Sequence, residues 1–146
     1  MVPSANPRAG YLAHREEIDA AIRDVMENGR YILGPRVGEF EEHFARYLGA
    51  AHCLGVASGT DALQLALRAC GVKAGERVIT ASHTAVATVA AIDWIGAVPV
   101  LVDVAPGTQT LDPEKVEETL RLAGSPAVKA IVAVHLYGHP ADMKAL

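Results

Sequence analysis

Three short, largely apolar runs, separated by stretches of helical periodicity, constrain the fold of this chain more than any other feature. They cover residues 77–80, 98–103 and 130–134, and a fourth run at residues 53–57 precedes them. Each run is continuously apolar rather than alternating, which is typical of strands buried on both faces. Helices between such strands imply right-handed crossovers and a mainly parallel sheet. We therefore predict a three-layer α/β fold with helices on both faces of the sheet.

The remaining segments have the spacing of amphipathic helices. Two of them, residues 11–28 and 37–48, precede the sheet, and a glycine follows each. Three more, residues 60–69, 84–95 and 113–122, alternate with the apolar runs. Two N-terminal helices should therefore lead into the sheet.

The domain organisation follows from composition. Residues 1–10 contain two prolines and a glycine without apolar periodicity, so we predict an arm that is ordered only by packing against another surface. Residues 11–146 show no linker and no repeat, and the chain has 51% hydrophobic residues, as expected for one globular domain rather than a disordered tail.

Charge and cysteine content exclude other classes. The chain has 13 basic against 17 acidic residues, a formal charge of −4 and no basic run, so we expect no nucleic-acid partner. It has neither a signal-peptide pattern nor an apolar run near the ~20 residues of a membrane span. Cys53 and Cys70 lie in apolar stretches, which predicts buried thiols in the cytoplasm. Trp94 follows an apolar helix face and is expected in the core.

Ligands of open α/β sheets bind beyond the carboxyl ends of the strands, so the strand-to-helix turns hold the candidate site residues. The first turn is Ser58-Gly59-Thr60, where backbone N–H groups, the helix dipole and the Thr60 hydroxyl favour a phosphate. The alternative is a plain helix cap formed by Ser58, with Asp61 completing the arrangement. The glycine spacings of dinucleotide-binding loops and P-loops are absent.

The second turn contains His83, which could stack on a flat cofactor or titrate near neutral pH. The alternative is a surface histidine in a turn, with Ser82 or Thr84 as the helix cap. Asp103, at the end of the next apolar run, is either functional or a turn former.

The third turn contains His135, Tyr137 and His139. Gly138 and Pro140 break the helical geometry that two histidines four residues apart need to share a metal, and no acidic third ligand is close in sequence. We therefore expect no metal site and assign this turn to substrate contacts or structural hydrogen bonds.

Four segments in order resemble a known family. They are GRYILGPRVGEFEEHFARYLG, CLGVASGTDALQLALRACGVKAGERVIT, SHTAVATVAAIDWIGAVPVLVDV and VKAIVAVHLYGHPADM. Together they are similar to the N-terminal portion of the DegT/DnrJ/EryC1/StrS sugar aminotransferases, fold-type I enzymes that use pyridoxal phosphate. The resemblance covers residue 11 to the end and implies that residues 11–146 are part of the pyridoxal-phosphate-binding large domain, with no second domain.

The resemblance implies amino transfer, commonly from glutamate, to the keto group of a nucleotide-linked deoxysugar, in a homodimer. By position, the turn at Ser58, Gly59 and Thr60 would hold the cofactor phosphate. His83 and Ala85 lie where the family supplies a ring that stacks on the pyridine. Many members have an aromatic residue where this chain has Ala85, so either His83 stacks or that face is covered less well. Residues implied to border the substrate are Tyr31, Leu33, His135 and Tyr137.

The reacting groups of this chemistry are a lysine that forms the Schiff base and a carboxylate that keeps the pyridine nitrogen protonated. In the family both lie beyond the HLYG segment, and this chain ends at Leu146. The four lysines, Lys73, Lys115, Lys129 and Lys144, match no motif position.

We therefore expect a fragment of a sugar-nucleotide aminotransferase that is inactive alone. The alternative is a non-catalytic regulatory module that binds the cofactor or a sugar nucleotide. An unrelated Rossmann-like nucleotide binder is disfavoured by the missing glycine spacing. We also expect the last strand to expose a sheet edge.

Overall fold

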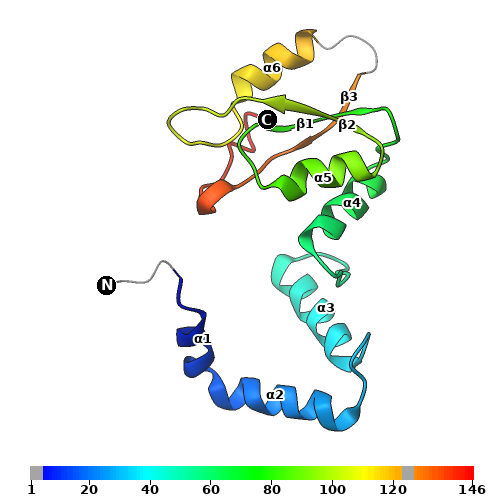
Figure 1. The fold of residues 1–146 in the computed structure, drawn as a ribbon, viewed down its shortest axis with the longest axis vertical. Coiled ribbons are helices and arrows are strands. Elements are labelled where there is room, and N and C mark those ends of the chain that lie inside the picture. The colour runs from blue at the N-terminus through cyan, green and yellow to red at the C-terminus, as the bar shows by residue number, and fades with distance from the viewer. Residues whose placement is uncertain (1–4, 123–126) are drawn as a thin grey trace. The chain divides into compact units, whose positions relative to one another are not determined.

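The computed structural model describes residues 5–122 and 127–146 (Figure 1). The chain divides into two compact units, one up to Gly55 and one from Val56 onward. Each unit is described by itself below. The predicted division into an arm at residues 1–10 and one large domain stays a prediction.

The first unit consists of three helices, α1 (Pro7–Ala13), α2 (Arg15–Asn28) and α3 (Pro35–Leu48). The prediction of one helix over residues 11–28 is wrong at its start, because α1 begins at Pro7 and a break at His14 separates it from α2. The Asn6 side chain accepts a hydrogen bond from the Ala9 N–H at 3.2 Å. Asparagine at the cap and proline at the first helical position form a start signal, so residues 7–10 of the predicted arm are helical.

The ends of α2 and α3 confirm the sequence-based boundaries. Gly29 and Gly49 follow them with φ of 66°, the left-handed conformation that glycine adopts without steric cost. The start of α3 lies at Pro35 rather than at residue 37, again with proline in the first turn.

The second unit is an α/β sheet of parallel strands in the order β2-β1-β3. At the centre of the sheet, Ile79 of β1 pairs with Val100 of β2 and with Ile131 of β3. The predicted mainly parallel sheet is therefore confirmed, and β3, the last strand, lies at an edge as expected. The elements are α4 (Gly59–Ala69), β1 (Arg77–Ala81), α5 (Val86–Trp94), β2 (Val98–Val102), α6 (Pro113–Leu122) and β3 (Val128–Val132).

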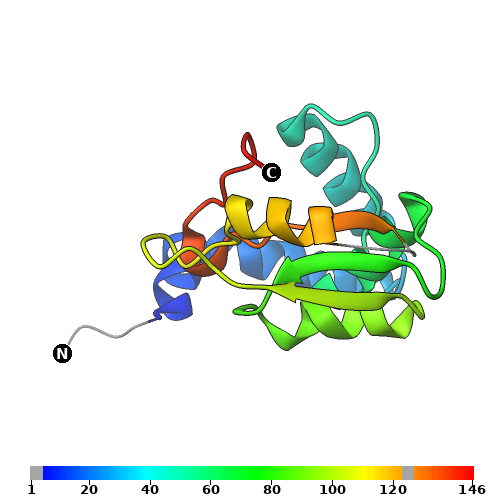
Figure 2. The ribbon, with the colours of Figure 1, turned by 90° about the horizontal axis from the view of Figure 1, so that it is seen from above.

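Helices cover both faces of this sheet. Figure 2 shows α5 and α6 on opposite sides of the strands. On one face, Val78 packs with Leu67 of α4 and Ile92 of α5. On the other face, Ile79 packs with Leu111 and Val116, the latter from α6. The three-layer arrangement is thus confirmed, with β1 at its centre.

The prediction of a strand at residues 53–57 is wrong. No strand forms there among the described residues, and the Gly55 N–H donates to Glu41 Oε1 at 2.7 Å instead of to a neighbouring strand. An apolar run becomes a strand only where another strand offers its free N–H and C=O groups. The last strand begins at Val128, two residues earlier than predicted, so Lys129 lies within it.

Two side chains expected in the core are exposed. Trp94, the last residue of α5, is 64% exposed. Because α5 has apolar residues on nearly every side, its sequence does not show which face is buried. Cys70 is also exposed, since it follows the last residue of α4 as the C-cap, whereas Cys53 is half-buried.

We predict that Ile92→Ala destabilises the second unit by about 2–5 kcal/mol, because it leaves a cavity where a fully buried side chain lay. Urea denaturation measures this change. Val86→Ala on the same helix is the control, since Val86 is 82% exposed, and it should change the stability by less than about 0.5 kcal/mol. Equal effects of the two substitutions would contradict the assignment of the buried face of α5.

Candidate cofactor site

The carboxyl ends of β1, β2 and β3 meet at one edge of the sheet, because the strands are parallel. Ser82 follows β1 and Asp103 follows β2, and the Ser82 hydroxyl donates to Asp103 Oδ1 at 3.3 Å. The Ser82 N–H donates to the Val102 carbonyl at 2.8 Å. Asp103 therefore fixes the start of the turn that carries His83, and Ser82 does not cap α5.

His83 and Tyr137 lie together at this edge. The Tyr137 hydroxyl is 3.5 Å from His83 Nε2, and the two ring centroids are 6.0 Å apart with the planes tilted by 54°. Sequence reasoning assigned these residues to different ligands and missed their pairing. Strand order brings them together, because β1 and β3 are neighbours and each residue follows one of them, and no local pattern in the sequence gives that order.

The turn after β3 is held by His135 and places Tyr137 in an unusual conformation. The Ala141 N–H donates to His135 Nδ1 at 3.0 Å, so the histidine forms a structural hydrogen bond. Tyr137 has φ of 55° and Gly138 has φ of 80°. The predicted structural hydrogen bonds are therefore present, and a role of His135 and Tyr137 toward substrate stays a prediction.

Ala85 stands at the start of α5 as its N-cap, without a side-chain hydrogen bond. The Thr84 hydroxyl lies 3.0 Å from that of Thr88, so it does not cap the helix either. The cap expected from Ser82 or Thr84 is thus wrong. Ala85 is exposed and brings only a methyl group to the turn that carries His83.

At the start of α4, the cap and the phosphate hypotheses prove compatible. Ser58 Oγ accepts from the Asp61 N–H at 3.1 Å and donates to Asp61 Oδ2 at 2.8 Å, which is the predicted cap. Among the described residues, neither the Gly59 and Thr60 N–H groups nor the Thr60 hydroxyl has a hydrogen-bond acceptor. The cap uses Ser58 and Asp61 and leaves these donors available at the positive end of the helix.

These groups fit a phosphate. A Cβ added at Gly59 would meet no atom within 4 Å, so the space beside the first turn is open to a ligand. The Asp61 carboxylate is the one acidic group in the first turn of α4, and the Ser58 hydroxyl already donates to it. The remaining donors at this helix terminus suit an anion.

Tyr31 and Leu33 lie in the first unit, in the loop between α2 and α3, so their place beside the second-unit residues stays a prediction. Leu33 has φ of 48°, and the Tyr31 hydroxyl donates to the Met26 carbonyl at 3.2 Å. Arg36 Nη2 bonds Asp24 Oδ2 at 2.7 Å and thereby raises the pKa of the guanidinium. This ion pair ties the loop's two flanking helices together.

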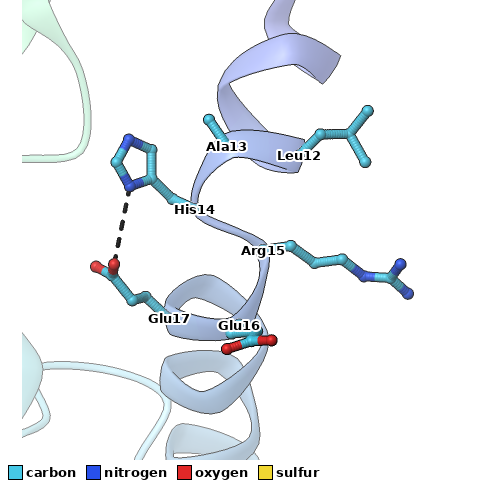
Figure 3. Close-up of a pocket in the computed structure, with 6 residues that line it drawn as sticks. All are labelled: Leu12, Ala13, His14, Arg15, Glu16 and Glu17. Atoms are coloured by element: carbon cyan, nitrogen blue, oxygen red, sulfur yellow. Dashed lines mark ion pairs between the residues drawn. The ribbon is translucent and has the colours of Figure 1, made fainter.

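A surface hollow at the break between α1 and α2 does not have the features of a ligand site. Its polar side chains diverge, with His14 and Glu17 to one side and Arg15 to the other (Figure 3). His14 Nδ1 lies 3.9 Å from Glu17 Oε1. Within residues 5–122 and 127–146, no three His, Cys, Asp or Glu side chains are grouped to bind a metal. In the same residues, every helix is too short or too polar to cross a membrane.

The chain belongs to the DegT/DnrJ/EryC1/StrS aminotransferase family, whose model matches residues 13–146. A relative from Streptomyces venezuelae, dTDP-3-amino-3,4,6-trideoxy-alpha-D-glucose transaminase, is 48% identical over 145 residues. That match covers 99% of this chain and 37% of the relative. The chain thus spans little more than a third of the length of the curated relative it matches.

Solved structures show the same fold. DesV from S. venezuelae superposes with a TM-score of 0.89 at 47% identity, over 99% of this chain and 38% of that one. NtdA from Bacillus subtilis, solved with bound cofactor PMP, superposes with a TM-score of 0.82 at 35% identity, over 91% of this chain and 30% of that one. The expected fold-type I architecture and family are therefore confirmed.

We predict that Ser58→Ala lowers the free energy of unfolding by about 0.5–2 kcal/mol, the usual cost of losing a helix cap. Thermal unfolding followed by circular dichroism measures it. Ser58→Asp retains an acceptor for the Asp61 N–H but brings a second carboxylate beside that of Asp61, so it should recover only part of the loss. An Ala variant as stable as the parent would show that this cap does not stabilise α4.

Proposed function

We propose that the protein containing this chain transfers an amino group from glutamate to the keto group of a nucleotide-linked deoxysugar, using pyridoxal phosphate. The observation that carries the proposal is the family match over residues 13–146, together with the open first turn of α4. Supporting it, the S. venezuelae relative is by name a transaminase of a dTDP-linked amino sugar.

The first turn of α4 binds the cofactor phosphate in this proposal. The N–H groups of Gly59 and Thr60 and the Thr60 hydroxyl donate to it, and the helix dipole favours its charge. Ser58 holds the turn through its bonds to Asp61 rather than by giving its own hydroxyl to the ligand. When bound, the cofactor supplies an electron sink for amino transfer.

The cofactor ring would lie against His83, with Ala85 beside it. The substrate would be bordered by His135 and Tyr137 from the turn after β3. Tyr31 and Leu33, in the loop before α3 of the first unit, are separately proposed as substrate contacts. The exposure of Tyr31, Leu33 and Tyr137 supports contact with a ligand rather than a role in the core.

Three of the four lysines lie at the opposite end of the strands or are engaged in an ion pair. Lys73 precedes β1 and Lys129 is at the amino end of β3, so both are at the opposite end of the strands. Lys115 Nζ pairs with Glu118 on α6 at 3.3 Å. Lys144, in the C-terminal turn, is exposed. We therefore propose that none of them reacts with the cofactor and that this chain alone does not catalyse amino transfer.

Treatment of the chain with pyridoxal phosphate and borohydride tests this proposal. We expect saturable cofactor binding without selective reduction onto any one lysine, read by peptide mass spectrometry. Binding without transfer also matches the alternative of a non-catalytic binding module. Selective labelling of a single lysine, with 2-oxoglutarate formed from glutamate, would contradict the proposal that the chain lacks the reacting groups.

Thr60→Val tests the phosphate site. It keeps the shape of the side chain and removes one charge-assisted hydrogen bond, so the dissociation constant for pyridoxamine phosphate should rise about 10- to 100-fold. Thr119→Val is a matched control, because Thr119 is likewise half-buried and its hydroxyl bonds a carbonyl within α6. Equal affinities of the Thr60 and Thr119 variants, measured by calorimetry, would place the phosphate elsewhere.

We also propose a cytoplasmic homodimer. Among residues 5–55 only Ala45 is buried, while Phe40 and Phe44, stacked with centroids 5.4 Å apart, are both exposed. An apolar helix face of this kind favours association.

The free thiols of Cys53 and Cys70 support a reducing compartment. Residues 1–10 are proposed to act as an arm that packs on a neighbouring surface.

Sedimentation equilibrium tests the proposed homodimer. It should give twice the mass of the chain, and a monomer at micromolar concentration would contradict the dimer.

A further inference from the structure

We infer that Tyr137 is a positioning residue that holds the His83 ring in place for the cofactor, on the side where Ala85 provides no ring. The inference rests on the proposed function, because it takes His83 as the ring that faces the cofactor. Beside its proposed place at the border of the substrate, Tyr137 thereby gains a second role, which acts on the cofactor through His83.

The backbone of Tyr137 favours a functional role for its side chain. Its φ of 55° lies in the left-handed region, which a residue with a Cβ rarely adopts and a bulky one least of all. The turn is held by other groups, namely the Ala141 N–H on His135 Nδ1 and the His139 N–H on the Leu136 carbonyl, each at 3.0 Å. Glycine or asparagine would suit this position better, so the turn alone does not explain a tyrosine.

Burial does not explain why a tyrosine occupies position 137 either. The side chain is 84% exposed, so it contributes little to the core. What it does contact is His83, through a hydroxyl 3.5 Å from Nε2 and a ring whose centroid is 6.0 Å away. That separation is within the range of tilted aromatic pairs. A ring-to-ring contact and a polar contact at Nε2 together restrict the rotation of the imidazole.

Fixing the His83 ring matters because the other bonds of this turn hold the residue before it rather than the ring itself. The preceding residue, Ser82, is anchored to Asp103 and to Val102, whereas among the described residues the His83 side chain has no hydrogen bond except that to Tyr137. A freely rotating ring loses its rotational entropy when a cofactor stacks on it. A ring held in advance loses less, and the affinity for the cofactor rises accordingly.

The first test needs no ligand. Side-chain couplings measured by NMR on the chain should give one dominant χ1 rotamer for His83, and averaged rotamers in Tyr137→Asn. Asparagine tolerates the left-handed region, so this variant should keep the melting temperature of the parent. Tyr47→Phe is the matched control, because Tyr47 is 83% exposed on α3, and it should leave the His83 rotamer unchanged.

The second test is a double-mutant cycle on the dissociation constant for pyridoxamine phosphate. Tyr137→Phe should raise the constant about two- to tenfold, as expected for the loss of one neutral hydrogen bond. In a His83→Ala background the same substitution should have no effect, because Tyr137 acts through the histidine. Tyr47→Phe should change the constant in neither background.

The outcomes separate this inference from the proposed function. A parent chain that does not bind pyridoxamine phosphate would overturn the proposed cofactor site and the inference with it. A parent that binds, but in which the His83 rotamers are already averaged, would overturn the inference alone. So would an effect of Tyr137→Phe that persists undiminished after His83→Ala.

Discussion

The architecture of the second unit depends on the burial of β1 from both sides. Val78 faces α4 and α5, Ile79 faces α6, and both side chains are completely buried. Burying such a side chain contributes about 1.5–3 kcal/mol. Because β1 is central and parallel to both neighbours, the segments after all three strands must emerge at one edge. The same burial that stabilises the sheet therefore gathers the polar residues that follow its strands.

The polar side chains at the starts of α4 and α5 form different kinds of hydrogen bond. At α4, Ser58 and Asp61 bond each other and cap the helix, and among the described residues the Gly59 and Thr60 N–H groups have no acceptor. At α5, no side chain caps the helix, and Ala85 occupies the cap position. The polar groups near α5 instead bond across the sheet edge, from Ser82 to Asp103. The anchored turn is thus the one that carries His83.

Ala85, the N-cap of α5, brings no ring to the turn that precedes this helix. His83 is therefore the side chain of this turn that carries a ring. Tyr137 approaches that histidine from the end of the adjacent strand β3. The two rings therefore come from segments that follow two neighbouring strands, β1 and β3.

Apart from the run at residues 53–57, the sequence by itself determined which segments of the second unit become strands and helices, because continuous apolar runs and helical spacing are local signals. The start of α4 at the Ser58-Gly59 turn and the glycine ends of α2 and α3 were likewise readable, since caps depend on neighbouring residues. The start of α1 at Pro7 was readable in principle from Asn6 and Pro7 but was missed.

Only the tertiary structure decided the rest, because it depends on partners distant in sequence. The run at residues 53–57 has strand composition, yet the Gly55 N–H bonds a carboxylate rather than another strand. Because α5 is apolar on nearly every side, only packing selects the face that it buries, and Trp94 lies outside that face. The pairing of His83 with Tyr137 follows from the strand order β2-β1-β3, and strand order is set by packing over the whole sheet rather than by any local pattern of residues.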